Sequence, residues 1–174
     1  MIETERLIVR PWRDADREPF FAMACDPEVM RFLLPLNTRA ESDERIDSLM
    51  AMQADHGHCF WAVERKEDGR FLGFCGVVVP REPIWEHEIG WRLARDAWGQ
   101  GYAYEAAQAS LDWAWQHIDT PSIMAITNIE NTRSWGLMER LGMRRYPEED
   151  FEHPSVPVGD PLRPHILYRI HRPQ

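Results

Sequence analysis

At 174 residues, the chain has the length of one domain that can bury a hydrophobic core without help from metals or disulfides. Hydrophobic residues make up 44% and charged residues 28%, which is typical of a globular rather than a disordered chain. The formal net charge of −9 argues against a nucleic-acid partner, because affinity for nucleic acid depends on lysines and arginines that neutralise phosphates. We therefore expect a single domain over residues 1–174 that does not bind nucleic acid.

The cysteines and the start of the chain indicate a reducing, cytoplasmic setting. Cys25, Cys59 and Cys75 are odd in number and have no CxxC spacing, so they are predicted to be small core residues. The first twelve residues are interrupted by charges and lack the apolar centre of a signal peptide. No apolar run approaches the roughly 20 residues that span a bilayer, so no membrane partner is expected.

The first half of the chain predicts a strand, two helices and a hairpin. The strand is Leu7–Arg10, stopped by Pro11. A helix capped by Asp14 or Asp16 should reach about Cys25, where Asp26-Pro27 breaks it, and a second helix should cover about 40–53. Strand-like runs at 59–65 and 71–79 flank an Asp-Gly pair at 68–69, which is a strong hairpin signal.

The second half predicts strand, helix, strand, helix and strand. Residues 85–93 read as a strand with Ile89, Trp91 and Leu93 on one face and Glu86, Glu88, Gly90 and Arg92 on the other. A glycine turn at 98–103 opens a helix to about His117, whose stripe of small residues would let it lie close to a sheet: Ala103, Ala106, Ala107, Ser110 and Ala114.

The last segments follow the same logic. A strand is predicted at 123–127, then a helix capped by Asn131 and ended by Gly142, a proline-rich loop from Pro147 to Pro164, and a final strand at 165–171. Antiparallel strands come first, and the strand–helix–strand unit that follows should pair its strands in parallel. The prediction is an α+β domain with a mixed sheet and helices on both faces.

The glycine turn is the segment that points to chemistry. The first turn of a helix offers unsatisfied N–H groups and the positive end of its dipole, and Gly99 and Gly101 allow close approach of the backbone to an anion. No Lys-Ser/Thr pair follows as in a P-loop, and Tyr104 stands where a dinucleotide-binding fingerprint needs its third glycine. Taken alone, the glycines would be read as a tight turn.

Agreement along the chain favours a functional interpretation. The pieces are TERL at 4–7 with Arg-Pro at 10–11, EIGW at 88–91, WGQGYA at 98–103 with Glu-Ala at 105–106, NTRS at 131–134 and LGM at 141–143. In this order and spacing the sequence resembles the GNAT superfamily of N-acetyltransferases, in particular its RimJ/RimL-like (ribosomal-protein N-terminal acetyltransferase-like) branch. The resemblance covers about residues 4–171. It implies a mostly antiparallel sheet with a central, splayed pair of parallel strands.

The resemblance also implies acetyl-CoA as co-substrate, with no metal. Its diphosphate would bind the backbone N–H groups of the glycine turn, and its pantetheine arm would pair with the strand backbone near Leu93. Asn131 would hydrogen-bond the cofactor or nearby backbone, a role compatible with a plain helix cap. The cofactor-binding residues implied in this way are Leu93, Trp98, Gly99, Gln100, Gly101, Tyr102, Ala103 and Asn131.

Acetylation of an amine requires a neutral nitrogen, so a carboxylate is a reasonable general base for an ammonium with a pKa of roughly 8–10. Glu88 is the candidate, because the branch often carries Glu there; Glu86, on the same face, is its competitor, and the alternative for Glu88 is a salt-bridged strand carboxylate. Many members have a tyrosine general acid where this chain has Met138. Ser134 is the candidate acid instead, unless its hydroxyl only bonds the helix backbone.

Other interpretations remain open at this level. The chain could be an acyl-CoA sensor that has lost turnover, or an interaction domain with no cofactor. The run His56-Gly57-His58-Cys59 lacks the spacing of zinc ligands, so a metal site is not predicted. The acceptor is expected to be a small-molecule or peptide amine, and the protein a monomer or a homodimer.

Overall fold

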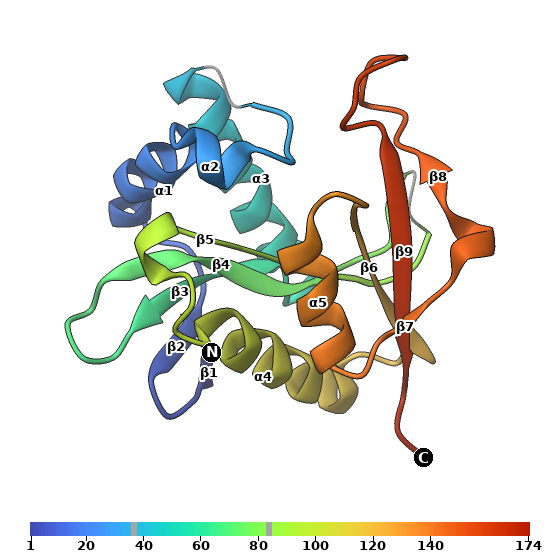
Figure 1. The fold of residues 1–174 in the computed structure, drawn as a ribbon. Coiled ribbons are helices and arrows are strands. Elements are labelled where there is room, and N and C mark those ends of the chain that lie inside the picture. Colours follow the sequence, from blue (N-terminus) through green and yellow to red (C-terminus); the bar gives the residue numbers. More distant parts are fainter. Residues whose placement is uncertain (36–37, 83–84) are drawn as a thin grey trace.

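The computed structural model describes residues 1–35, 38–82 and 85–174. Across these residues the strands join in one sheet, in the order β1-β2-β3-β4-β5-β6-β9-β7, with β8 paired to β9 (Figure 1). The strands are β1 Ile2–Glu3, β2 Leu7–Arg10, β3 Phe60–Arg65, β4 Phe71–Val78, β5 Glu88–Leu93, β6 Ser122–Asn128, β7 Arg144–Arg145, β8 Phe151–Glu152 and β9 Pro164–His171. Every pairing is antiparallel except β5 with β6, so the expected mixed, mostly antiparallel sheet is confirmed.

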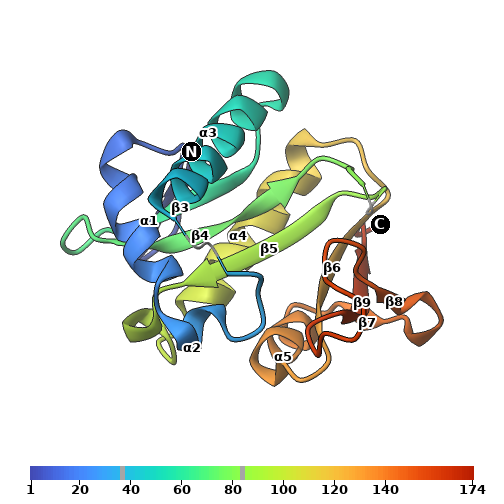
Figure 2. The ribbon, with the colours of Figure 1, turned by 90° about the horizontal axis from the view of Figure 1, so that it is seen from above.

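Helices cover both faces of this sheet, as expected. They are α1 Arg17–Ala24, α2 Pro27–Met30, α3 Arg39–His56, α4 Tyr102–His117 and α5 Thr132–Arg140. The first three lie on one side of the sheet, α4 lies on the other, and α5 stands beside β6 (Figures 1 and 2). No helix in the described stretches combines the length and the apolarity that a bilayer crossing requires.

Small side chains bring α4 close to the sheet. Ala106, Ala107, Ser110 and Ala114 are fully buried on its inner face. The Ser110 hydroxyl donates to the carbonyl of Ala106 at 2.8 Å and lies 3.8 Å from the sulfur of Cys75 on β4. The predicted stripe therefore does what its spacing suggested, and it fixes the start of α4 relative to the end of β5.

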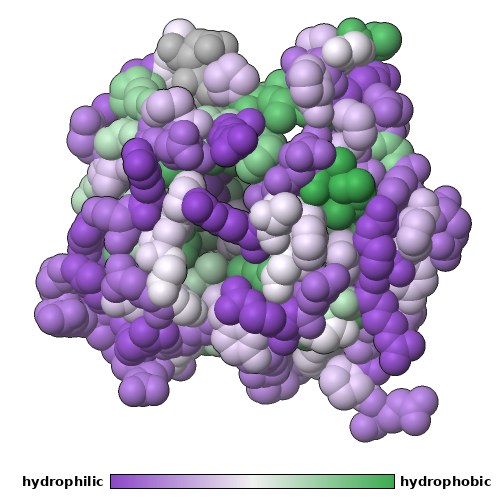
Figure 3. All heavy atoms as spheres, viewed as in Figure 1, coloured by the Kyte–Doolittle hydropathy of each residue, from purple (hydrophilic) through white to green (hydrophobic). Residues whose placement is uncertain are grey.

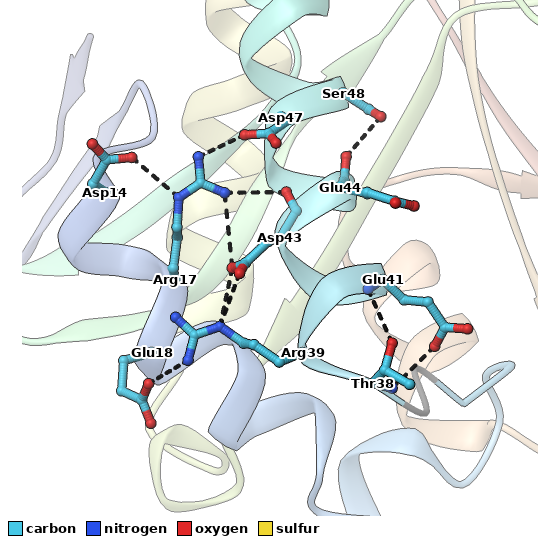
Figure 4. Close-up of polar contacts among 10 residues, drawn as sticks. All are labelled: Asp14, Arg17, Glu18, Thr38, Arg39, Glu41, Asp43, Glu44, Asp47 and Ser48. Atoms are coloured by element: carbon cyan, nitrogen blue, oxygen red, sulfur yellow. Dashed lines mark hydrogen bonds and ion pairs between the residues drawn. The ribbon is translucent and has the colours of Figure 1, made fainter.

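Ion pairs hold α3 against α1 on the opposite face (Figure 4). Arg17 contacts Asp14 at 3.1 Å and Asp47 at 2.6 Å, while Arg39 joins Glu18 at 2.5 Å. A capping box between Thr38 and Glu41 starts α3, and Gly57 ends it with φ 78°. These contacts position the inner side of α3 over the sheet.

Several element boundaries differ from expectation. Asp14–Asp16 form a 3-10 turn before α1, and Pro27, expected only to break a helix, starts the short α2. Strand β5 begins at Glu88 and not at residue 85, because its partner β4 ends at Val78, opposite Glu88. The proline-rich stretch 147–164 contains β8, which pairs with β9. Cys59 and Cys75 are buried as predicted, but Cys25 is exposed.

One buried ion pair joins β2 to the turn before α1. Both terminal nitrogens of Arg10 donate to the carboxylate of Asp16, at 2.7 and 2.9 Å, and both side chains are at least 96% buried. Glu64 on β3 accepts a further hydrogen bond from Arg10 at 2.8 Å. Removing Asp16 would leave a guanidinium in the interior with only one of its two carboxylate partners.

We expect Asp16→Ala to lower the free energy of unfolding by about 3–5 kcal/mol, the usual cost of breaking a buried pair. The matched control is Asp14→Ala, whose carboxylate is 88% exposed and contacts Arg17 at the surface; its effect should stay below about 1 kcal/mol. Urea denaturation of both variants measures the difference. Equal effects would mean that the buried pair does not anchor the first helix.

Candidate active site

A gap between β5 and β6 opens directly after their one point of pairing. Glu88 pairs with Met124, whose N–H donates to the carbonyl of His87 at 2.9 Å. Beyond this point the strands diverge (Figure 2), and a hollow is visible between the α1–α3 side and the α5–β9 side (Figure 3). Because strand backbones alternate, the odd-numbered residues of β5 direct their N–H and C=O groups into the gap. The N–H of Leu93 is therefore turned toward it.

The glycine turn meets this gap at the end of β5. Gly99 and Gly101 adopt φ of 74° and 82°, and α4 begins at Tyr102 with no side-chain cap. Within the described residues, no intramolecular hydrogen bond uses the N–H groups of residues 99–104. The N–H of Trp98 differs from them because it donates to the carbonyl of Arg95 at 3.2 Å. The turn thus presents free donors at the positive end of a 16-residue helix.

An N-terminal clamp, made by Thr4, Arg6 and Glu105, orients the turn. The Glu105 carboxylate accepts from the hydroxyl of Thr4 at 2.6 Å and from Nε of Arg6 at 2.7 Å. Nη1 of Arg6 then donates to the carbonyl of Gln100 at 2.9 Å. Since C=O and N–H of one trans peptide point in opposite directions, this bond turns the N–H of Gly101 away from Arg6. Burial tends to raise the pKa of Glu105, but the hydrogen bonds from Thr4 and Arg6 outweigh it and lower that pKa.

Trp98 connects the turn with both walls of the gap. Its indole N–H donates to the carbonyl of Leu93 at 2.8 Å, which satisfies the last backbone acceptor of β5. The guanidinium of Arg133, on the first turn of α5, lies 4.8 Å from the centre of the indole ring. Trp98 therefore fixes the end of β5 and holds a cation, Arg133, close to the glycine turn.

Glu88 and Glu86 have different surroundings although they share a strand face in the prediction. Glu86 precedes β5, and Arg169 on β9 binds its carboxylate at 2.6 and 2.9 Å. This bond to Arg169, which burial only partly offsets, lowers the pKa of Glu86. The Glu88 side chain is 11% exposed, and its carboxylate contacts Arg81 at 2.6 Å. Of the two carboxylates, Glu88 is the one at the mouth of the gap.

Two of the predicted site residues lie at the start of α5, Asn131 just before it and Ser134 in its first turn. Ser134 is half-buried, and its hydroxyl has no hydrogen-bond partner among the described residues, so the backbone-bonding alternative does not apply in this structure. Asn131 is the N-cap residue of α5, as predicted, but its side chain makes no capping hydrogen bond, because its amide donates to the hydroxyl of Thr127 at 3.0 Å. Met138 stands where many family members carry the tyrosine general acid, and its thioether cannot donate a proton. Its side chain is 1% exposed and packs in the core.

The histidine-rich run before β3 is divided: His56 and Gly57 are exposed at the end of α3, whereas His58 and Cys59 are buried in the packing. Nδ1 of His58 lies 2.7 Å from the carbonyl of Val77, and burial raises the pKa of the Cys59 thiol to about 12. Over the described ranges, no group of three or more His, Cys, Asp or Glu side chains is arranged to hold a metal ion.

Two residues of the site were missed from the sequence: Arg81 after β4, and the clamp residue Arg6, which was noted only as part of a motif. Each acts through a contact with another element, Arg81 with Glu88 on β5 and Arg6 with Glu105 on α4. Arg81, for example, follows Pro80 and reaches back to Glu88. No local spacing marks such a residue, and only the pairing of β4 with β5 could have suggested it.

The comparisons agree with this geometry. A family profile described as "Acetyltransferase (GNAT) domain" matches residues 6–144. The protein YkkB of Bacillus subtilis is 32% identical over 142 residues, 80% of this chain and 83% of that protein. A GNAT-family acetyltransferase structure from Bacillus anthracis superposes with a TM-score of 0.80 at 26% identity, covering 98% of both chains.

A more distant structure shares the fold. It is spermidine N-acetyltransferase from Vibrio cholerae in complex with CoA and spermine, with a TM-score of 0.76, 16% identity and 97% of both chains covered. The profile match over most of the chain means that this protein belongs to the GNAT acetyltransferase family. It is an acyltransferase that takes acetyl-CoA as co-substrate and acetylates an amine.

We expect Gly101→Val to abolish acetyl-CoA binding, because a β-branched residue resists φ of 82° and would reorient the free N–H groups. The matched control is Gly57→Val at the end of α3, which has φ 78° but lies outside the turn; an added Cβ there meets no atom within 4 Å, and at Gly101 it meets only Nη2 of Arg6, at 3.4 Å. Calorimetric titration with acetyl-CoA should show loss of binding only for Gly101→Val, at least about 100-fold. Unchanged affinity would remove the turn from the cofactor site.

Proposed function

We propose that this chain is a single-domain N-acetyltransferase of the RimJ/RimL-like branch, in which a primary amine attacks acetyl-CoA directly in a ternary complex. The observation that carries this proposal is the meeting of two sets of unpaired backbone donors, residues 99–104 of the turn and Leu93 of β5, at one gap. The motifs at 4–7, 88–91 and 131–134 favour the branch. The acceptor would be a small-molecule or peptide amine, and the protein cytoplasmic.

The cofactor would lie along the gap. Backbone N–H groups of residues 99–103 would hold its diphosphate, with the Trp98 indole and Asn131 beside it. The N–H of Leu93 would pair with the pantetheine arm or donate to the thioester oxygen as negative charge develops there. Free donors of this kind suit an anion, because an uncapped helix start leaves N–H groups that water or a ligand must satisfy.

Two side chains would move protons. Glu88 would take a proton from the acceptor ammonium, directly or through water, so that the neutral nitrogen can attack. Ser134 would donate toward the departing sulfur, which needs only modest help because a thiol has a pKa of roughly 8.5. Its unpartnered hydroxyl favours this role over a structural one.

Two measurements test the proposal against its alternatives. Acetyl-CoA at 100 times its Kd should add about 2.7 kcal/mol to stability, and the absence of a thermal shift at millimolar acetyl-CoA would favour a cofactor-free interaction domain. Amine-dependent release of free thiol, corrected for hydrolysis, then separates an enzyme from a sensor. Tight binding without amine-dependent thiol would favour the sensor.

We expect Glu88→Gln to reduce kcat by about 10²–10⁴ at pH 6.5 while the Kd for acetyl-CoA changes less than about threefold. The deficit should shrink as the pH approaches the pKa of the acceptor amine, because neutral amine is then supplied by solution. Glu86→Gln is the matched control: it weakens a bond to Arg169 and should lower stability with little effect on kcat. Equal rates for Glu88→Gln and the wild type would place the base elsewhere.

A further inference from the structure

Three arginines from separate segments lie on the side of the sheet that carries Glu88, and one of them, Arg81, contacts its carboxylate. Arg45 comes from α3, Arg81 from the segment after β4, and Arg92 from β5. Sheet register places Glu88, Gly90 and Arg92 on the same face of β5, opposite Val78, Gly76 and Phe74 of β4. This face is the one that α1–α3 cover (Figure 1). We refer to the three residues as the arginine cluster.

Two aromatic rings form the floor under this cluster. Phe60 and Phe74 stack with their ring centres 5.5 Å apart. Arg81 lies 5.9 Å from the centre of the Phe60 ring, and Arg92 lies 5.2 Å from that of Phe74. A Cβ at Gly90 would come within 2.8 Å of the Phe60 ring, so the glycine is what lets the ring lie against β5. The two guanidinium groups therefore each lie near one ring of the same stacked aromatic pair.

The positive charge of the cluster is not balanced by the described chain. Glu88 contacts Arg81, whereas Arg45 and Arg92 have neither an ion pair nor a hydrogen bond among the described residues. Burial, and then the charge of Arg45, lowers the pKa of Arg92 to about 10. Desolvation by the surrounding protein lowers the pKa of Arg45 as well, and Arg81 adds to this while Glu88 opposes it, although Arg45 as a whole residue is exposed. Both still carry a charge at neutral pH.

The arginine cluster contains buried nitrogen atoms that have no hydrogen-bond partner in the described part of the chain. Within the described ranges, the buried side-chain nitrogen and oxygen atoms that lack any partner are Nη1 of Arg81, Nε of Arg92 and the hydroxyl oxygen of Ser42. Two of these atoms, Nη1 of Arg81 and Nε of Arg92, belong to the arginine cluster. Buried polar atoms are rarely left unsatisfied, so these two favour a ligand that binds the cluster.

We propose that the acceptor amine carries an anionic group, a carboxylate or a phosphate, which the arginine cluster binds while the amine faces Glu88. This inference rests on the proposed acetyltransferase function and narrows its substrate class to small amines with a negative charge. Guanidinium forks match both kinds of anion. The partly buried guanidinium of Arg92 has no counter-ion among the described residues, and such an anion would offset the cost of its desolvation. A polyamine, by contrast, would bring positive charge to three arginines and one carboxylate.

The test compares acceptors that differ only in this charge. α-Amino acids and phosphoethanolamine represent the carboxylate and the phosphate, the corresponding amino-acid amides and ethanolamine are the neutral partners, and spermidine is the cationic one. At saturating acetyl-CoA, kcat/KM for one of the anionic acceptors should exceed that of its neutral partner at least tenfold. The preference should fall to within about twofold in Arg92→Met and in Arg45→Met.

Two controls keep these effects interpretable. Arg13→Met removes a guanidinium that is 59% exposed and lies outside the cluster, so it should leave the preference unchanged. A binding measurement serves independently of turnover: with CoA present, the N-acetylated anionic products should bind at least tenfold more tightly than their neutral counterparts, and only in proteins with an intact cluster. Calorimetry of the folded variants with acetyl-CoA should show an unaltered cofactor site.

The outcomes separate the two proposals. If acetyl-CoA binds and neutral amines or spermidine are acetylated as well as the anionic acceptors, the anion site is wrong and the acetyltransferase proposal stands. The anion site is equally wrong if the acetylated anions bind no better than their neutral counterparts, or if an acidic peptide is the preferred acceptor. If acetyl-CoA itself does not bind, both proposals fall together.

Discussion

The divergence of β5 from β6 is the constraint on which the rest of the site depends. Each of the two strands has a second neighbour on its other edge, β4 for β5 and β9 for β6. Residues 88–93 of β5 pair along their whole length with β4, while residues 122–128 of β6 pair along theirs with β9. Each strand follows its better partner, and the sheet twist separates them after one shared position at Glu88 and Met124. The result is a strand edge inside the protein whose backbone groups have no strand to bind.

An unpaired edge in the interior must be satisfied by something else. At the end of β5 the indole N–H of Trp98 donates to the carbonyl of Leu93, so this acceptor has a partner within the chain. Among the described residues, the N–H of Leu93 itself stays free. The glycine turn shows the same arrangement: Arg6 donates to the carbonyl of Gln100, and the N–H of Gly101 has no partner in the described ranges. In both places a side chain removes an acceptor and a donor stays free. A surface of donors alone selects for a ligand rich in acceptors, as a diphosphate and an amide-containing arm are.

The sequence carried the local parts of this arrangement. Hydrophobic alternation predicted the face of β5, glycine spacing predicted the turn before α4, and the small-residue stripe predicted how α4 packs. The pairs that make the site work were not accessible, because Arg6 with Gln100, Arg81 with Glu88 and Arg169 with Glu86 join segments that are far apart or lie outside regular elements. Residues two apart on one predicted face, such as Glu86 and Glu88, could not be distinguished until their partners from other strands were known.

The overall charge makes this local arrangement of cations necessary. A chain with net charge −9 repels an anionic cofactor at long range, although salt screens that repulsion beyond about 8 Å. Binding must then come from groups within that distance. In the proposed sites these groups would be the N–H dipoles of the turn for the cofactor, with Arg133 near the Trp98 ring, and the arginine cluster for the acceptor. The same acidic surface would attract polycationic amines, so discrimination against them has to be built inside the gap. The proposed arginine cluster would provide this discrimination, because guanidinium groups near Glu88 repel a second positive charge on the acceptor amine.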